Sequence, residues 1–187
     1  MIRARASVPH HPCVVLGFAP AKTGAPAWAA DSPSGARLAE LVGVVPAQLP
    51  ALFALDNLWP APKPDHAQLR EAAQLYQFLP GWWYVLAGSG VLKAFGKRAR
   101  PADAAGWWDQ RVLEWYDSRE GVTMAVLPHP SGLTRWYNDQ ANRERAEKFL
   151  RAAASNHACT GAGGAHRAWR ADRARHDQAR QEARRVR

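Results

Sequence analysis

The loop at residues 128–131, Pro-His-Pro-Ser, carries the side chains best suited to chemistry in this chain of 187 residues. It follows an apolar run at 122–127 that predicts a buried strand. A strand that enters such a loop places the imidazole of His129, the hydroxyl of Ser131 and unpaired backbone amides at the carboxyl edge of a sheet. Because open α/β folds bind their ligands at that edge, we expect a ligand site here.

A second loop, 17–20 with the sequence Gly-Phe-Ala-Pro, has the same relation to an apolar run near the N-terminus. The carboxyl ends of parallel strands meet at one edge of a sheet. The two loops therefore predict one cleft with two walls.

The elements that must position these loops are four apolar runs and the helical patterns between them. The predicted strands are 13–16, 52–55, 83–87 and 122–127. The predicted helices are 34–42, 65–79, 91–95, 101–115 and 138–154. In the last of these, one stripe holds Ala141, Arg145, Phe149 and Ala152. Strands that alternate with helices predict a three-layer α/β/α sandwich around a four-stranded parallel sheet.

The sequence pattern predicts that the chain has three parts. Residues 1–12 form an N-terminal extension without the apolar segment of a secretory signal. Residues 13–155 form one domain, which we expect to be monomeric. Residues 156–187 contain a glycine-rich stretch at 161–164, continue as an arginine-rich basic tail, and are expected to be flexible.

The net charge of the chain is 25 − 16 = +9, and 20 of the 25 basic residues are arginine. Guanidinium groups bind phosphate in a bidentate way, so this balance suits a nucleic-acid partner. Eight of the arginines lie in 165–187. The tail therefore either binds phosphates without sequence preference, or only solubilises the protein, or is cleaved off.

Two cysteines, Cys13 and Cys159, are too few for a disulfide framework or a cysteine-rich metal site. We expect Cys13 to be a buried thiol and the protein to be cytoplasmic or associated with the nucleoid. No apolar run reaches the roughly 18 residues that span a bilayer, so no membrane partner is expected.

Five segments, in chain order, resemble the motifs of the uracil-DNA glycosylase superfamily, and most of all its family 4 and family 5 branch. They are GFAPAKTG at 17–24, GARLAEL at 35–41, DNLWPAPKP at 56–64, LAGSGVLKAF at 86–95 and HPSGL at 129–133. The resemblance runs from about residue 13 to 150. It implies the uracil-DNA glycosylase fold and a DNA-repair hydrolase that flips a uracil-like or modified pyrimidine into a pocket and hydrolyses its N-glycosidic bond.

The resemblance also implies roles in the pocket for four residues. His129 would face the base carbonyl and stabilise the negative charge that develops on the leaving base. Trp28 stands where the family places its stacking aromatic, although a core position fits it as well, and Phe18 lies beside the same base. The amide of Asn57 both donates and accepts, which suits a pyrimidine edge, but also suits a turn after a strand.

Four further residues are candidates for contacts with DNA. Ser131 would hold a phosphate, and Leu133 would fill the space that the flipped base leaves. Arg135 would grip the backbone. Ser89 begins a predicted helix, where it either receives a phosphate or serves as an N-cap.

The sequence departs from the family in two respects. Phe18 and Ala19 occupy positions where many members carry a polar group that activates water. Asp31 is the best remaining match to a downstream catalytic Asp, although it is equally placed to cap the helix at 34–42. The four cysteines of an iron–sulfur cluster are also lacking, so we predict no metal and no other cofactor.

Two other functions stay open. The chain fits a non-catalytic relative that recognises a modified base or nucleotide, because its first motif is apolar. It also fits an enzyme that modifies a DNA base on the same fold, and its compact form would suit a phage protein.

Overall fold

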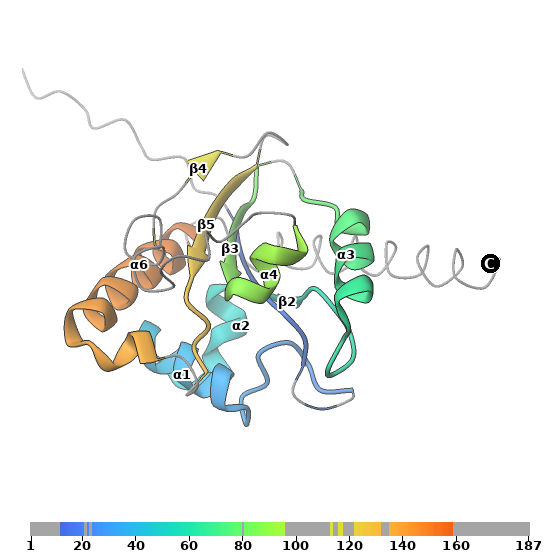
Figure 1. Cartoon of the computed structure of the whole chain (residues 1–187). Helices are drawn as coiled ribbons and strands as arrows, with labels where there is room; N and C mark the ends of the chain where they lie inside the picture. Colours follow the sequence, from blue (N-terminus) through green and yellow to red (C-terminus); the bar gives the residue numbers. More distant parts are fainter. Residues whose placement is uncertain are drawn as a thin grey trace, which may run out of the picture.

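A twisted sheet lies between two layers of helices in the computed structural model (Figure 1). The structure describes residues 12–20, 22, 24–79, 81–95, 113, 116–117, 122–131 and 135–158. The strands follow the order β2-β1-β3-β5-β4 across the sheet. Most of the predicted extension and most of the predicted tail lie outside the described residues.

Four of the strands are parallel, which confirms the predicted α/β class and sheet. They are β1 (Cys13–Gly17), β2 (Ala54–Asn57), β3 (Trp83–Ala87) and β5 (Thr123–Leu127). A two-residue strand, β4 (Tyr116–Asp117), pairs antiparallel with β5 at the edge and was not predicted. Since β2 and β3 flank β1 on opposite sides, the chain reverses its direction of winding beside β1, where open α/β sheets form their ligand crevice.

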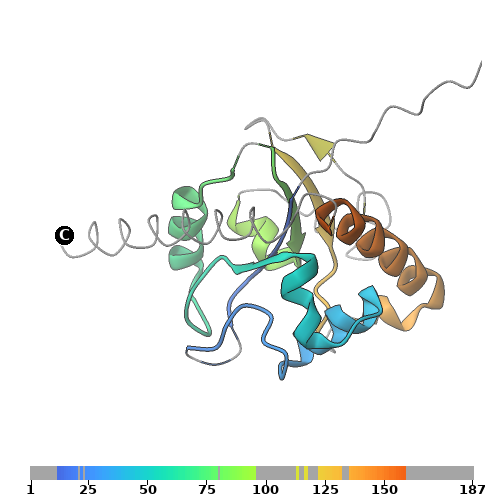
Figure 2. The ribbon, with the colours of Figure 1, turned by 180° about the vertical axis from the view of Figure 1, so that it is seen from behind.

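The helices divide between the two faces of the sheet (Figures 1 and 2). One face carries α1 (Pro33–Val42), α2 (Leu49–Leu52) and α6 (Gln140–Ala158), and the other carries α3 (His66–Leu75) and α4 (Ser89–Ala94). Two short 3-10 helices, η1 (Pro46–Gln48) and η2 (Arg135–Asn138), precede α2 and α6. None of the helices in the described ranges is long and apolar enough to cross a membrane.

Successive residues of each central strand pack into different cores. Val15 and Val85 belong to the core under α1 and α6, whereas Val14 and Tyr84 belong to the core under α3 and α4. Strands that are buried on both faces are typical of parallel sheets. Cys13 is fully buried, as predicted.

The start of α1 is fixed by local interactions. The Ser32 hydroxyl accepts a hydrogen bond from the Gly35 amide at 3.0 Å, and Pro33 occupies the first helical turn. Both features are typical of helix N-termini. The alternative that Asp31 caps this helix is therefore wrong, because Ser32 is the capping residue.

The strand predicted at 52–55 begins two residues later in the structure. Residues 49–52 form α2, and the strand begins only at Ala54. An apolar run by itself does not separate a buried helical turn from a buried strand. The shift places Asn57 as the last residue of β2, opposite Gly17 of β1.

The predicted helix at 65–79 ends at Leu75. Asp65 caps α3 with a reciprocal bond to Gln68, but Tyr76 takes an extended conformation. There its hydroxyl donates to a carboxylate oxygen of Asp56 at 3.0 Å, and its ring packs against Phe78. Packing of the aromatic ring at the sheet thus ends a pattern that is helical by spacing alone.

The helix α6 is present, but its buried stripe differs from the prediction. Buried side chains include Ala146, Phe149, Leu150, Ala153 and Ala154, whereas Ala141, Arg145 and Ala152 are exposed. A helix rich in alanine has little contrast between its faces, so the stripe is poorly defined by sequence. Most of the predicted helix at 101–115 lies outside the described residues.

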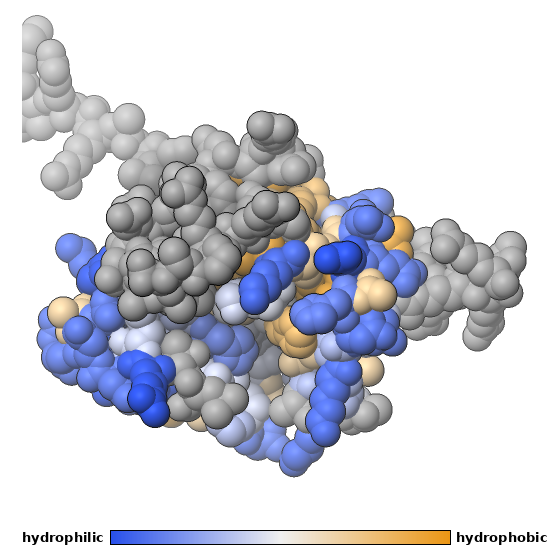
Figure 3. Space-filling view, in the orientation of Figure 1, coloured by the Kyte–Doolittle hydropathy of each residue, from blue (hydrophilic) through white to orange (hydrophobic). Residues whose placement is uncertain are grey.

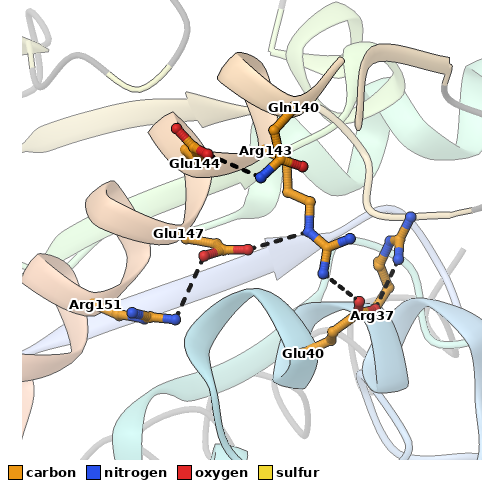
Figure 4. Close-up of polar contacts among 7 residues, drawn as sticks. All are labelled: Arg37, Glu40, Gln140, Arg143, Glu144, Glu147 and Arg151. Carbon is orange, nitrogen blue, oxygen red and sulfur yellow. Dashed lines mark hydrogen bonds and ion pairs between the residues drawn. The ribbon is translucent and has the colours of Figure 1, made fainter. Parts of the chain in front are cut away.

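An ion-pair network on the surface joins α1 to α6 (Figure 4). Arg143 of α6 donates to Glu40 of α1 at 2.6 Å and to Glu147 at 3.1 Å. Arg37 also donates to Glu40 at 2.7 Å, and this hydrogen bond lowers the pKa of the Glu40 carboxyl. Hydrophilic side chains cover the molecule over α1 and α6, while hydrophobic ones show near α3 and α4 (Figure 3).

Candidate functional site

A cavity of about 580 Å³ opens at the carboxyl ends of β1, β2 and β5. Its lining comes from the exits of these strands and from the loop that leads from β1 into α1. The lining residues are Gly17, Phe18, Ala19, Pro20, Lys22, Ala25, Pro26, Trp28, Ala29, Asp31, Ser32, Pro33, Ser34, Asn57, His129 and Ser131. Pockets of this size are typical of small-molecule sites.

Six of the nine residues singled out from the sequence line this cavity: Phe18, Trp28, Asp31, Asn57, His129 and Ser131. Ser89 and Arg135 do not line it, and Leu133 lies outside the described residues. Ser89 is not an N-cap either, because Gly88 holds that position in α4. Arg135 is exposed at the start of η2.

The protonation state of His129 follows from one hydrogen bond. The backbone amide of Ser131 donates to Nδ1 of His129 at 3.2 Å. An amide can only donate, so Nδ1 carries no proton and the proton of the neutral ring sits on Nε2. Burial lowers the pKa of His129 below its ordinary value of 6.5, which favours this neutral form. The residue therefore provides a neutral N–H donor in the wall of the cavity.

The loop that carries His129 is anchored to the elements around it. The Tyr137 hydroxyl, which is buried, donates to the carbonyl of Pro128 at 2.7 Å. Burial raises the pKa of Tyr137, so this donor stays protonated. The backbone amide of Gly88 donates to the carbonyl of Leu127 at 2.8 Å. These two hydrogen bonds fix Leu127, the last residue of β5, and Pro128, the first residue of the loop.

Trp28 is both a core residue and a wall of the cavity. Only 6% of the residue is exposed, and its indole N–H donates to the carbonyl of Val15 at 3.1 Å. Its ring stacks on that of His129 with centroids 5.9 Å apart and planes at 25°. Trp28 thus occupies a core position and also contributes to the cavity lining, while its stacking on a base stays a prediction.

Asn57 and Trp28 both pack against Gly17. A Cβ atom at position 17 would lie 2.5 Å from the Asn57 side-chain oxygen and 3.1 Å from the Trp28 ring. Only glycine allows the two side chains to approach the strand this closely. Asn57 is half-buried, and its carboxamide has no hydrogen-bond partner in the part of the chain that the structure describes. Its donor and acceptor are thus available to a ligand.

The charged groups of the cavity lie on its outer part. Asp31 and Lys22 are both exposed, and both belong to the loop between β1 and α1. Sequence reasoning missed Lys22, Ser34 and Tyr137. Lys22 lies in the GFAPAKTG segment at 17–24 and could have been noticed there, but no motif marks Tyr137.

Comparison of the chain with models of known protein families matches none of them, and comparison with curated proteins finds no similar sequence. Its class therefore rests on the molecule itself, an α/β protein with a cavity at the carboxyl edge of a parallel sheet. Among the described residues, no group of three or more His, Cys, Asp or Glu side chains is arranged to hold a metal ion.

Replacing Gly88 with alanine is expected to displace His129. The φ angle of Gly88 is +95°, and an added Cβ would lie 3.0 Å from Cβ of His129 and 3.2 Å from its ring. With ψ at 156° this backbone conformation is adopted almost only by glycine, so we expect a stability loss of roughly 1–3 kcal/mol together with a shift of the His129 ring resonances in NMR spectra. Gly81→Ala, with a φ of +75° and nothing within 4 Å, is the control that changes stability alone. Unchanged His129 resonances in Gly88→Ala would contradict this expectation.

The lowered pKa of His129 predicts how stability depends on pH. In the unfolded chain the ring binds a proton near pH 6.5, whereas the folded protein resists protonation until a lower pH. Stability is therefore constant above about pH 6.5 and falls as the pH drops below it. Urea unfolding at pH 7.5, 6.5 and 5.5 should show this loss in the wild type but less of it in His129→Asn. A His129 pKa of 6.5 or above, measured by NMR, would refute the prediction.

Proposed function

We propose that the protein is a DNA glycosylase of the uracil-DNA glycosylase fold. It would bind DNA, take a uracil-like or modified pyrimidine into the cavity and hydrolyse the N-glycosidic bond. The observation that carries the proposal is the neutral His129, whose Nε2 proton is fixed by the Ser131 amide and which lines the same cavity as Asn57 and Phe18. The resemblance of five sequence segments to this superfamily adds support.

The proposed reaction gives a separate role to each of three residues that line the cavity. When the bond between the base and C1′ of the sugar breaks, its electron pair leaves with the base and its charge spreads to a carbonyl oxygen. The Nε2–H of His129 donates to that oxygen, which stabilises the charge in a partly dehydrated pocket. Water adds to C1′ and gives its proton to Asp31, and the amide of Asn57 reads the edge of the base.

A second function, binding of a modified base or nucleotide without hydrolysis, is favoured by the part of the cavity lining that comes from the loop between β1 and α1. Phe18 and Ala19 carry no group that positions water, and Asp31 is exposed. A base-modifying enzyme would use the same pocket with another reactant.

One experiment separates these functions. Single- and double-stranded oligonucleotides that contain uracil, hydroxymethyluracil, hypoxanthine or thymine are incubated with the full-length protein and then treated with alkali. Strand cleavage at the modified position is the expected result. Binding without cleavage for all four bases would favour the non-catalytic function, and no binding even at low ionic strength would overturn both proposals that involve DNA.

A further inference from the structure

Phe18 rests directly on the backbone of α4. A Cβ atom at Gly90 would lie 2.6 Å from Cδ2 and 2.7 Å from Cε2 of the Phe18 ring. Both distances are shorter than real Cβ contacts, so any side chain at position 90 requires a shift. The ring of Phe18 therefore lies where it does because residue 90 has no side chain.

The backbones on both sides of this contact are held in place. The Trp59 amide donates to the Phe18 carbonyl at 3.1 Å, and the Leu58 amide donates to the Gly17 carbonyl at 2.9 Å. On the other side, Val91 of α4 is fully buried, and the Gly88 amide is bonded to β5. A larger residue at position 90 would thus be accommodated by the Phe18 side chain alone.

Phe18 lines the cavity, whereas no residue of α4 does, so the ring lies between that helix and the open space. To regain an ordinary contact of 3.4 Å with a new Cβ, the ring atoms must move by about 0.8 Å, and they must move away from α4. That displacement narrows the cavity. We propose that Gly90 is a positioning residue that sets the depth of the pocket through Phe18, and so determines how large a base it accepts.

The inference deepens the proposed function and rests on it for the nature of the ligand. With glycine at position 90, we expect the cavity of about 580 Å³ to accept a base larger than uracil, such as a 5-substituted pyrimidine or a purine. A hydrophobic pocket discriminates by about 10- to 200-fold for one methylene group. A methyl group at position 90 is therefore expected to shift the preference toward the smaller base by at least about tenfold.

The functional test compares the affinity for oligonucleotides containing hydroxymethyluracil or hypoxanthine with the affinity for uracil oligonucleotides. In Gly90→Ala, the affinity for the larger base divided by the affinity for uracil is expected to fall about tenfold. Adding Phe18→Ala should restore the ratio, whatever happens to the absolute affinity. Lys93→Ala, an exposed change on the same helix, is the control and should leave the ratio at the wild-type value.

A second readout does not depend on DNA. Gly90→Ala is expected to lower the melting temperature by about 3 °C or more in the wild-type background and by clearly less in the Phe18→Ala background. Equal losses in both backgrounds, or an unchanged base ratio in a variant that binds DNA, would overturn the inference. If the wild type binds no oligonucleotide while the melting temperatures still show the coupling, the proposed function fails and the positioning role of Gly90 stands without its ligand.

Discussion

Replacing His129 with alanine is expected to lower the rate of base release by about 10²- to 10³-fold, the usual effect of losing one donor to a developing anion. The variant loses the Nε2–H of a residue that lines the cavity but keeps the other lining residues, so binding of DNA should change much less than the rate. Single-turnover cleavage of the best oligonucleotide substrate measures the effect.

The chain offers a matched control for this experiment. His66, the first residue of α3, is exposed and does not line the cavity. His66→Ala should retain the wild-type rate. His129→Gln, which keeps an N–H donor on a flexible chain, should recover part of the loss. Full activity in a folded His129→Ala protein would remove His129 from the proposed mechanism.

Replacing Gly35 with alanine is expected to cause the largest loss of stability, roughly 3 kcal/mol, at the upper end of the cost of overpacking. The added Cβ would meet the carbonyl oxygen of Ala29 and lie 2.6 Å from that of Trp28. Both are backbone atoms, so the loop that lines the cavity must move as a whole. In a helix without such contacts, the same substitution would stabilise the protein by about 0.4–1 kcal/mol.

Chemical unfolding of Gly35→Ala and Gly24→Ala tests this expectation. Gly24 has a left-handed φ of +76° but nothing within 4 Å of an added Cβ. The free energy of unfolding of Gly24→Ala should therefore fall only by the roughly 1–2 kcal/mol that a left-handed backbone costs a residue with a side chain. If Gly35→Ala is no less stable than Gly24→Ala, the close approach of the loop to α1 is not a constraint on the fold.

The meeting of strand-end loops in one cavity could be predicted from the sequence. Phe18, Asn57 and His129 each follow or end an apolar run, and parallel strands bring such positions to one edge. The sequence motif at 128–131 also pointed to the residue with the most constrained chemistry in the site.

Other parts of the site depend on packing that no local pattern encodes. Tyr137 holds the His129 loop through a single hydroxyl, from a 3-10 helix that has no periodicity. Arg135 and Ser89 have suitable chemistry and lie close to the loops in sequence. Their elements nevertheless place them outside the cavity lining. Where a loop changes direction, proximity in sequence is a weak predictor of which residues line the same cavity.

The ion pair between α1 and α6 affects how the proposed binding of DNA must be measured. Glu40 and Arg143 lie 103 positions apart, and 45% and 33% of their side chains are exposed, so added electrolyte screens their attraction. Ser34 at the start of α1 lines the cavity, so any displacement of α1 when this pair is screened would alter a pocket wall in addition to the effect of salt on DNA phosphates. A plot of log affinity against log salt concentration would then overstate the number of counterions released from DNA. The slope measured in Glu40→Gln, where Arg143 keeps Glu147 as its partner, separates the two contributions.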